Sequence, residues 1–174
     1  MPEFELPSPA KFSVFKDVIF RHEVRTPDGQ IKSSGEHHLD LVPNAGLNWI
    51  SSQMAGTVSG TGTAIALGTG TAAPTMGDLT LGGEITGSGL TRVVGSLSGV
   101  GALAGLASGG ATIQTTGSFY VFNTFTASGT VTVNEAGVGV NVTFNAGIIA
   151  RDLLSPVASM AAGDTLRTEF NFIL

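Results

Sequence analysis

The sequence predicts a mainly β protein, with an antiparallel β-sandwich or jelly-roll-like fold, one short helix and an extended N-terminal arm. Apolar and polar residues alternate with a period of two in several segments, which is the pattern of half-buried strands. Gly-rich turns separate many short segments of this kind, and only one stretch shows helical spacing. These features together are typical of sandwiches and related all-β folds.

The length and composition predict a single domain. The chain has 174 residues, a hydrophobic content of 42% and a net charge of −5, and these values are not typical of a disordered chain. Residues 1–11 contain three prolines and few apolar residues, so we expect an extended arm there. Residues 12–174 are long enough to bury one core, and we expect them to form one β-rich domain.

The first expected elements are a charged hairpin and a helix. Phe12–Arg25 and Ile31–Leu41 flank the sequence Thr26-Pro27-Asp28-Gly29, in which proline and glycine favour a turn, so the two segments are expected to pair. Residues 44–54 carry apolar side chains at helical spacing and begin with Asn44, whose side chain can cap free backbone amides. We therefore expect one short helix from Asn44 to Met54.

The rest of the chain is expected to be strands and turns. Two copies of Gly-Thr-Gly-Thr-Ala flank residues 65–67, which predicts a strand between two glycine turns. Strict alternation predicts strands at 138–144 and 166–172. One segment is apolar on both faces, which predicts a central strand or a subunit contact; Phe119, Val121 and Phe125 point to one side and Tyr120 and Phe122 to the other.

Charge is distributed unevenly along the chain. The first 40 residues hold 12 of the 21 charged side chains, and none occurs from Val93 to Asn134. The surface of a soluble domain usually contains roughly 25–35% charged residues. We therefore expect the charge-free segment to be covered by protein as a subunit interface, and the charged arm and hairpin to meet solvent or another protein.

Several classes of protein are disfavoured by the composition. Only Arg92, Arg151 and Arg167 supply positive charge after residue 40, which is too little for a nucleic-acid surface. The chain has no cysteine, so disulfides and thiolate sites do not arise. The N-terminus lacks the features of a secretory signal, and the most apolar window, residues 93–111, is too rich in Gly and Ser to span a membrane.

Motifs for nucleotide binding and catalysis are weak. Gly68-Thr-Gly70-Thr-Ala-Ala73 fits a loose dinucleotide fingerprint, but no helical pattern follows it to hold a pyrophosphate. The last lysine is Lys32, so a phosphate-binding loop of the Walker type is absent. The histidines all lie between residues 22 and 38, and no nucleophile elbow accompanies them. We expect no enzymatic activity and no cofactor.

A metal site can be drawn from four residues of the hairpin. Glu36, His38 and Asp40 share one face of a predicted strand, and His22 lies on the partner strand. The alternative is a polar, solvated surface, which is the commoner role of such residues on a charged strand. We expect no bound metal.

Glu135 and Arg151 are isolated charges within uncharged β-structure. A buried charge must find a partner or cost several kcal/mol. We therefore expect Glu135 and Arg151, with Arg92 as a further candidate, to form ion pairs inside the fold or across a subunit contact.

The order and spacing of several short motifs resemble a β-rich module of tailed-bacteriophage virion proteins. This module occurs in tail-collar and fibre-attachment proteins and in small standalone virion proteins, and the resemblance covers roughly residues 44–174. The motifs, in order, are Asn44-Ala-Gly46-Leu47, Ile65-Ala-Leu-Gly-Thr-Gly70 with Ala73-Pro74, Leu81 to Glu84, Arg92, Asn134-Glu135-Ala-Gly137, Ala150-Arg151 with Ser155-Pro156, and Gly163-Asp-Thr-Leu166.

The resemblance implies a non-enzymatic virion protein without catalytic residues. The stretch between Arg92 and Thr112 is rich in Gly and Ala, and no fibre shaft follows Leu174, so a capsid-decorating cement protein is the expectation. Such a protein would bind the major capsid protein and copies of itself on the outer capsid surface, most simply as a homotrimer. The arm at residues 1–11 could extend onto a neighbouring subunit. A tail, neck or fibre-attachment protein is the alternative.

A host-glycan-binding module is a further alternative. Such a site needs exposed aromatic side chains over a polar groove. Besides its phenylalanines the chain offers Trp49 and Tyr120. Trp49 lies on the expected helix, where packing against the core is its commoner role.

Overall fold

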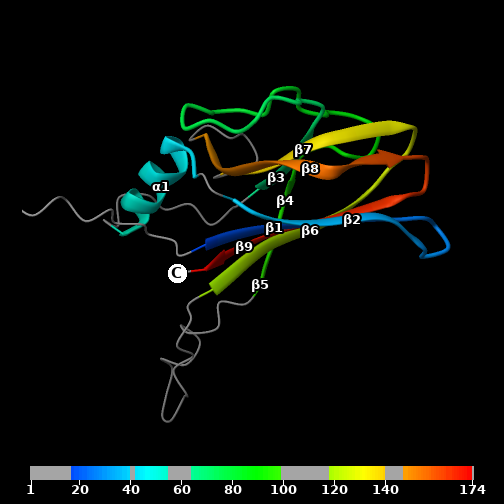
Figure 1. Cartoon of the computed structure of the whole chain (residues 1–174), viewed down its shortest axis with the longest axis horizontal. Coiled ribbons are helices and arrows are strands. Elements are labelled where there is room, and N and C mark those ends of the chain that lie inside the picture. Colours follow the sequence, from blue (N-terminus) through cyan, green and yellow to red (C-terminus); the bar gives the residue numbers. More distant parts are fainter. Residues whose placement is uncertain (1–16, 40–41, 55–63, 99–117, 140–146, 174) are drawn as a thin grey trace, which may run out of the picture.

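Two antiparallel sheets pack face to face in the computed structural model of the chain (Figure 1). The structure describes residues 17–39, 42–54, 64–98, 118–139 and 147–173. A mainly β, sandwich-like fold with one short helix is thereby confirmed. The expected arm at residues 1–11 lies outside the described residues.

Among the described residues, the larger sheet has five strands in the order β2-β1-β9-β6-β5, and all neighbours are antiparallel. The expected hairpin forms its edge, and the positive φ of Gly29 (87°) explains the glycine in the turn. The late strand β9 lies between β1 and β6. The five strands are β1 (Asp17–Arg25), β2 (Ile31–His38), β5 (Ser96–Ser98), β6 (Ser118–Thr126) and β9 (Thr165–Ile173).

The smaller sheet has four strands within the described part of the chain, in the order β4-β3-β7-β8. These are β3 (Ala64–Gly68), β4 (Val93–Val94), β7 (Val131–Gly139) and β8 (Ile148–Met160). The strand predicted at 138–144 overlaps the end of β7, which the structure describes from Val131 to Gly139 and which therefore begins seven residues earlier than predicted. The remaining residues of that prediction, Val140, Val142 and Phe144, lie outside the described residues.

The helix α1 (Asn44–Met54) has the bounds that the sequence predicts and packs beside β8. Gly46 makes this approach possible, since a Cβ there would lie 2.5 Å from the carbonyl oxygen of Ile149. Trp49 packs against the core, as expected for it. Among the described residues, no helix is long and apolar enough to cross a membrane.

The main core lies between the sheets and follows the period-two pattern of the strands. Leu166, Phe170 and Phe172 of β9 are buried, as their alternation predicts. The ring of Phe170 stacks on Phe20 of β1 with centroids 4.6 Å apart. Burying large aromatic side chains in this way contributes roughly 1.5–3 kcal/mol each relative to leaving them exposed.

The connection between β3 and β4, residues 69–92, forms a third layer over the other face of the smaller sheet (Figure 1). Leu81 of this connection packs into a second small core with Ala64, Ala66 and Ile148. Strand β3 is therefore buried on both faces, since Ile65 and Leu67 point into the main core. We call residues 69–92 the β3–β4 connection.

The chain itself closes one side of the sandwich. Strand β4 pairs with β3 in the smaller sheet, β5 pairs with β6 in the larger one, and Gly95 alone separates β4 from β5. A Cβ at Gly95 would lie 2.5 Å from Cγ1 of Val121, so the crossing requires glycine. An edge covered in this way offers few free backbone groups to a further strand.

Candidate functional site

The most strongly constrained place in the fold is a buried ion pair between β7 and β8. Glu135 has 0% of its surface exposed and Arg151 has 4%. The Nε of Arg151 donates to Oε2 of Glu135 at 2.7 Å. The predicted pairing of these two charges is thus found inside the fold, on the face of the smaller sheet that the β3–β4 connection covers.

The free oxygen of Glu135 holds the connection. Its Oε1 accepts hydrogen bonds from the backbone amides of Gly70 at 3.0 Å and Gly83 at 3.1 Å. Both amides belong to the β3–β4 connection, which leaves the sheet at Gly68 and returns past Gly83. A carboxylate that accepts several amide protons inside a protein is a strong, directional anchor. Glu135 therefore ties together the two ends of a loop.

Arg151 extends the same anchor to the tip of the connection. Its Nη1 donates to the carboxylate of Asp78, and its Nη2 donates to the carbonyl oxygen of Ala72 at 2.7 Å. Burial alone would lower the pKa of Arg151, but the hydrogen bonds to Glu135 and Asp78 outweigh it and raise that pKa above its usual range. The guanidinium stays charged and bridges two carboxylates.

Asp78 is held from the loop side as well. Its carboxylate accepts the backbone amide of Thr75 at 2.9 Å and the hydroxyl of Thr75 at 2.7 Å. Burial pushes the pKa of Asp78 upward, but the hydrogen bonds from Thr75 and Arg151 prevail and hold it below its usual range. Sequence reasoning missed Asp78, although the Thr-x-x-Asp spacing is a signal for such a turn.

Close packing against Glu135 explains why residues 68 and 70 are glycines. A Cβ at Gly68 would lie 2.5 Å from Oε1 of Glu135, and a Cβ at Gly70 would meet the same oxygen even more closely. The sequence Gly68-Thr-Gly70, which fits a loose dinucleotide fingerprint, thus leaves room for a buried carboxylate. No helix follows it among the described residues up to β4.

Arg92 pairs within the connection. Its Nη2 donates to the carboxylate of Glu84, and both side chains are largely buried. The three charges of the β3–β4 connection, Asp78, Glu84 and Arg92, are therefore all engaged in ion pairs. Residues separated by up to 83 positions in the sequence, from Gly68 to Arg151, meet at this place. We use the name anchor cluster for Glu135 and Arg151 together with the residues of the connection that they bind, which are Gly70, Ala72, Asp78 and Gly83.

The structure does not bring together His22, Glu36 and His38, the described residues among the four candidates for a metal site. His22 is buried and points toward the other sheet, whereas Glu36 and His38 are on the exposed face of β2. Glu36 pairs with Arg21 and His38 with Asp17, while Asp40 lies outside the described residues. The structure therefore separates His22 from the other candidates, because the strand register places it opposite Gly35. Among the described residues, no three His, Asp or Glu side chains are grouped as a metal site.

His22 and His37 instead hold a bulge of β8. The register between β7 and β8 shifts at residues 154–157 of β8, which form the bulge. The Nε2 of His22 donates to the carbonyl oxygen of Pro156 and that of His37 to the carbonyl oxygen of Ser155, both at 3.0 Å. Burial lowers the pKa of His22, so its neutral form is favoured. These contacts cover the side of the sandwich opposite the β4–β5 crossing.

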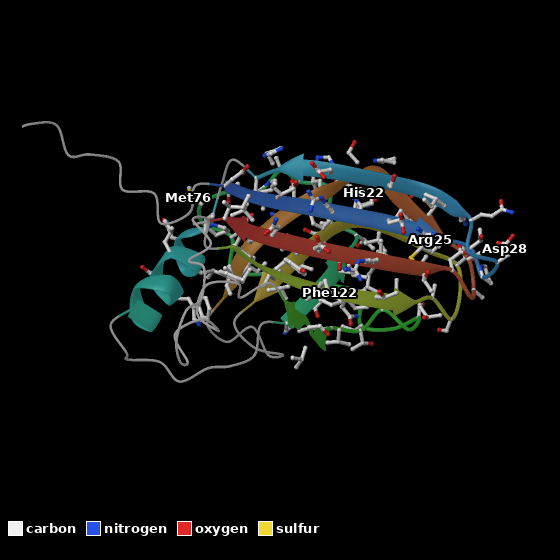
Figure 2. The ribbon with its side chains drawn as sticks, turned by 90° about the horizontal axis from the view of Figure 1, so that it is seen from below. His22, Arg25, Asp28, Met76 and Phe122 are labelled. Carbon is white, nitrogen blue, oxygen red and sulfur yellow. The ribbon has the colours of Figure 1, made fainter. Side chains whose placement is uncertain are left out.

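The outer face of the larger sheet carries many polar and charged side chains (Figure 2). A groove also lies on this face. The groove encloses about 440 Å³, and charged side chains of β1, β2 and β9 line most of it. Arg21 lies between Glu36 at 2.5 Å and Glu169 at 3.4 Å, and Arg167 lies 3.0 Å from Glu169. The charges of this face therefore neutralise one another across the strands.

Strand β6 has aromatic side chains on both faces, as predicted. Phe119 packs against the core, with its ring stacked on Phe172 at 4.8 Å. Tyr120 and Phe122 lie on the outer face, 6.1 Å apart, and the guanidinium of Arg167 lies 4.4 Å from the centre of the Phe122 ring. Strand β6 is an interior strand of its sheet, between β9 and the short strand β5.

Another ion pair joins two parts of the chain at the hairpin-turn end of the sandwich. Lys32 donates to the carboxylate of Asp164 at 2.6 Å, and the backbone amide of Ala161 donates to the same oxygen at 2.7 Å. Arg167, the arginine nearest to Asp164 in the sequence, pairs instead with Glu169. The hairpin end and the β8–β9 turn are thereby joined.

No protein-family model, no curated protein and no solved structure matches the chain.

Proposed function

We propose that the chain is a non-enzymatic structural protein of a tailed-bacteriophage particle that decorates and stabilises the capsid lattice as a symmetric oligomer. The observation that carries this proposal is the anchor cluster. Its charges fix the shape of a long surface connection rather than lining an open cavity. A protein that works by contact needs such a preorganised surface.

The residues that carry the resemblance also support the proposal. Gly70, Glu84, Arg92, Glu135 and Arg151 come from separate motifs, yet all of them belong to the anchor cluster and its connection. A set of motifs that meets at one place in three dimensions is a coherent structural signature. Its role in this chain is to attach a loop layer to a sheet.

The mechanism would be cumulative burial of surface. Each contact removes apolar area from water at about 25 cal/mol per Å², and the contacts repeat over a lattice. A protein that binds only the assembled shell shifts the equilibrium toward that shell. The partners in this proposal are the major capsid protein and two further copies of the chain in a homotrimer, on the outer surface of the virion.

The test is the location of the chain on purified particles of the phage that encodes it. Antibody fragments against the chain, seen by electron cryomicroscopy, are expected to label the capsid shell in a regular array. Particles lacking the chain are expected to lose their genome at a lower temperature. Label at the tail or neck would instead support the tail, neck or fibre-attachment alternative. Absence of the chain from the particle would refute both.

Glycan binding is a second candidate, and the groove on the larger sheet favours it. Tyr120 and Phe122 lie on the same outer face as the groove, beside Arg167 and Glu169. A polar groove next to aromatic rings is the usual form of a saccharide site. Binding on a glycan array that disappears in Tyr120→Ala but persists in Trp49→Phe would support this function, and an array without binding would remove it.

A further inference from the structure

Two histidines join the two sheets on the side of the sandwich where strands β2 and β8 lie. Within the described part of the chain, each of these strands is the last one of its sheet. The Nε2 of His22 donates to the carbonyl oxygen of Pro156, and the Nε2 of His37 donates to that of Ser155. We call these four residues the histidine seam. They hold the bulge of β8 against the larger sheet.

A glycine allows the close approach of the sheets at the histidine seam. Gly35 of β2 is paired with His22 of β1. A Cβ at Gly35 would overlap the carbonyl oxygen of Ser155 and would lie 2.5 Å from Cε1 of His22. Because residue 35 has no side chain, the carbonyl groups of β8 reach both imidazoles directly.

The imidazole of His22 has a hydrogen-bond partner for only one proton. His22 is 3% exposed, and the proton on its Nε2 binds Pro156. Among the described residues the buried Nδ1 has no partner, and the buried hydroxyl of Thr168, on the paired residue of β9, does not bind it. A second proton on the ring would therefore create a buried N–H group without an acceptor, which is costly.

A positive charge on His22 would also be without a counter-ion. Its ring stacks on Phe20 at 5.7 Å and on His37 at 6.2 Å, and neither neighbour is an anion. The carboxylates of β1, β2 and β9 form ion pairs on the other face of the sheet; these are Asp17, Glu23, Glu36 and Glu169.

Strand β8 carries two charged side chains, and both are engaged elsewhere. Arg151 belongs to the anchor cluster, and the carboxylate of Asp152 accepts the backbone amide of Leu153. Burial is the main cause of the lowered pKa of His22; the hydrogen bond to Pro156 opposes it, and the charge of His37 adds to it. Acid therefore places charge where the closed structure does not accommodate it.

We propose that the histidine seam is an acid-sensitive latch, which holds β8 against the larger sheet at neutral pH and opens when His22 is protonated. In the open form the imidazolium reaches water, and the carbonyl groups of Ser155 and Pro156 and the core-facing side of β8 become accessible. The anchor cluster keeps β8 attached to β7 and to the β3–β4 connection, so the opening is local. This inference concerns the fold itself and does not depend on the proposed function.

The extent of opening follows from proton linkage. The closed form binds fewer protons than the open form, so a fall in pH favours the open form. A histidine with the ordinary pKa of 6.5 that is charged only in the open form raises the ratio of open to closed molecules by up to about thirtyfold between pH 8 and pH 5. A closed form that takes up some protons lowers this factor, and we expect at least about fivefold.

Thiol labelling measures this opening. The chain has no cysteine, so Ala158→Cys places a single thiol at a buried core position next to the bulge. Ala136→Cys, equally buried on β7, is the matched control. A disulfide reagent that also reacts in acid is applied at pH 8 and pH 5, and the ratio of the two labelling rates removes the pH dependence of the reagent. The ratio of position 158 to position 136 is expected to rise at least about fivefold at pH 5.

Glutamine variants assign the effect to His22. In His22→Gln the side-chain amide can still donate to Pro156 but does not titrate, so the rise is expected to fall below about twofold. His38→Gln changes an exposed histidine that pairs with Asp17, and it is expected to keep the full rise. Equal melting temperatures at pH 8 show that the variants are folded. Hydrogen exchange of the unmodified chain, compared between residues 153–160 and 131–137, gives a second readout without any substitution.

Three results would overturn the inference. The first is a ratio of labelling rates that does not change between pH 8 and pH 5, including an equal acceleration at both positions through global unfolding. The second is a rise that persists in folded His22→Gln, and the third is an equal loss of the rise in His38→Gln. If His22→Gln does not fold, unchanged relative exchange of residues 153–160 in the wild type refutes the latch. Each of these results leaves the proposed function in place, because that function fails only by absence of the chain from purified particles.

Discussion

Replacing Glu135 by glutamine tests whether the anchor cluster holds the fold together. The amide has the shape of the carboxylate but only one accepting oxygen. It can face either Arg151 or the amides of Gly70 and Gly83, and not all three. Removing one partner of a buried ion pair typically costs about 3–5 kcal/mol. Arg151 keeps Asp78 and a backbone carbonyl, so we expect the lower end, about 3 kcal/mol.

Thermal unfolding followed by circular dichroism measures this loss. For a chain of this length, 1 kcal/mol corresponds to about 2–4 °C, so the melting temperature of Glu135→Gln should fall by about 6–12 °C. The matched control is Glu36→Gln, the same change in an exposed pair with Arg21, which should melt close to the wild type. If both variants melt within about 2 °C of the wild type, the anchor cluster does not stabilise the fold.

Three further predictions concern stability. Gly70→Ala should lower the melting temperature by several degrees, because its Cβ would overlap the buried carboxylate, whereas Gly129→Ala, with open space around it, should not. Burial lowers the pKa of His22, so the stabilisation from its neutral form is complete above the ordinary value of 6.5 and is lost as the pH falls toward the lowered pKa. The free energies of unfolding from urea titrations at pH 8 and pH 5 should therefore differ less in His22→Gln than in the wild type. The hydrogen bond from the backbone amide of Ala161 and then that from Lys32 lower the pKa of Asp164. The contribution of its carboxylate to stability is therefore lost as the pH falls through that lowered pKa. In Asp164→Asn the melting temperature should depend less on pH at the acid end of its profile.

Strands β1 and β9 of the larger sheet were predictable because one of their faces is solvated. In β1 and β9 apolar side chains alternate with charged ones, so the period of two is visible in the sequence. Residues 131–137 of β7 were not predicted, because residues 135–139 are buried on both faces and the alternation disappears where a loop layer covers the second face. Short-range patterns do not reveal such a layer.

The anchor cluster could be predicted only in part. Isolated charges in uncharged β-structure signalled that Glu135 and Arg151 need partners, because burial of an unpaired charge is costly. Nothing in local sequence indicated that Asp78 would be the second partner of Arg151, since 73 residues separate them. The role of the glycines also remained hidden, because it depends on the distance to a carboxylate in another strand.

The position of β9 at the middle of the larger sheet has a consequence for how the chain must fold. Strands β1 and β6 both pair with β9 along their length, and these strands are not neighbours of each other. Before residues 165–173 have been synthesised, the hairpin and β6 have no common surface to join. Assembly of this sheet therefore awaits a late segment of the chain, and a product truncated before Thr165 should expose two unfinished sheet edges, a feature that promotes aggregation.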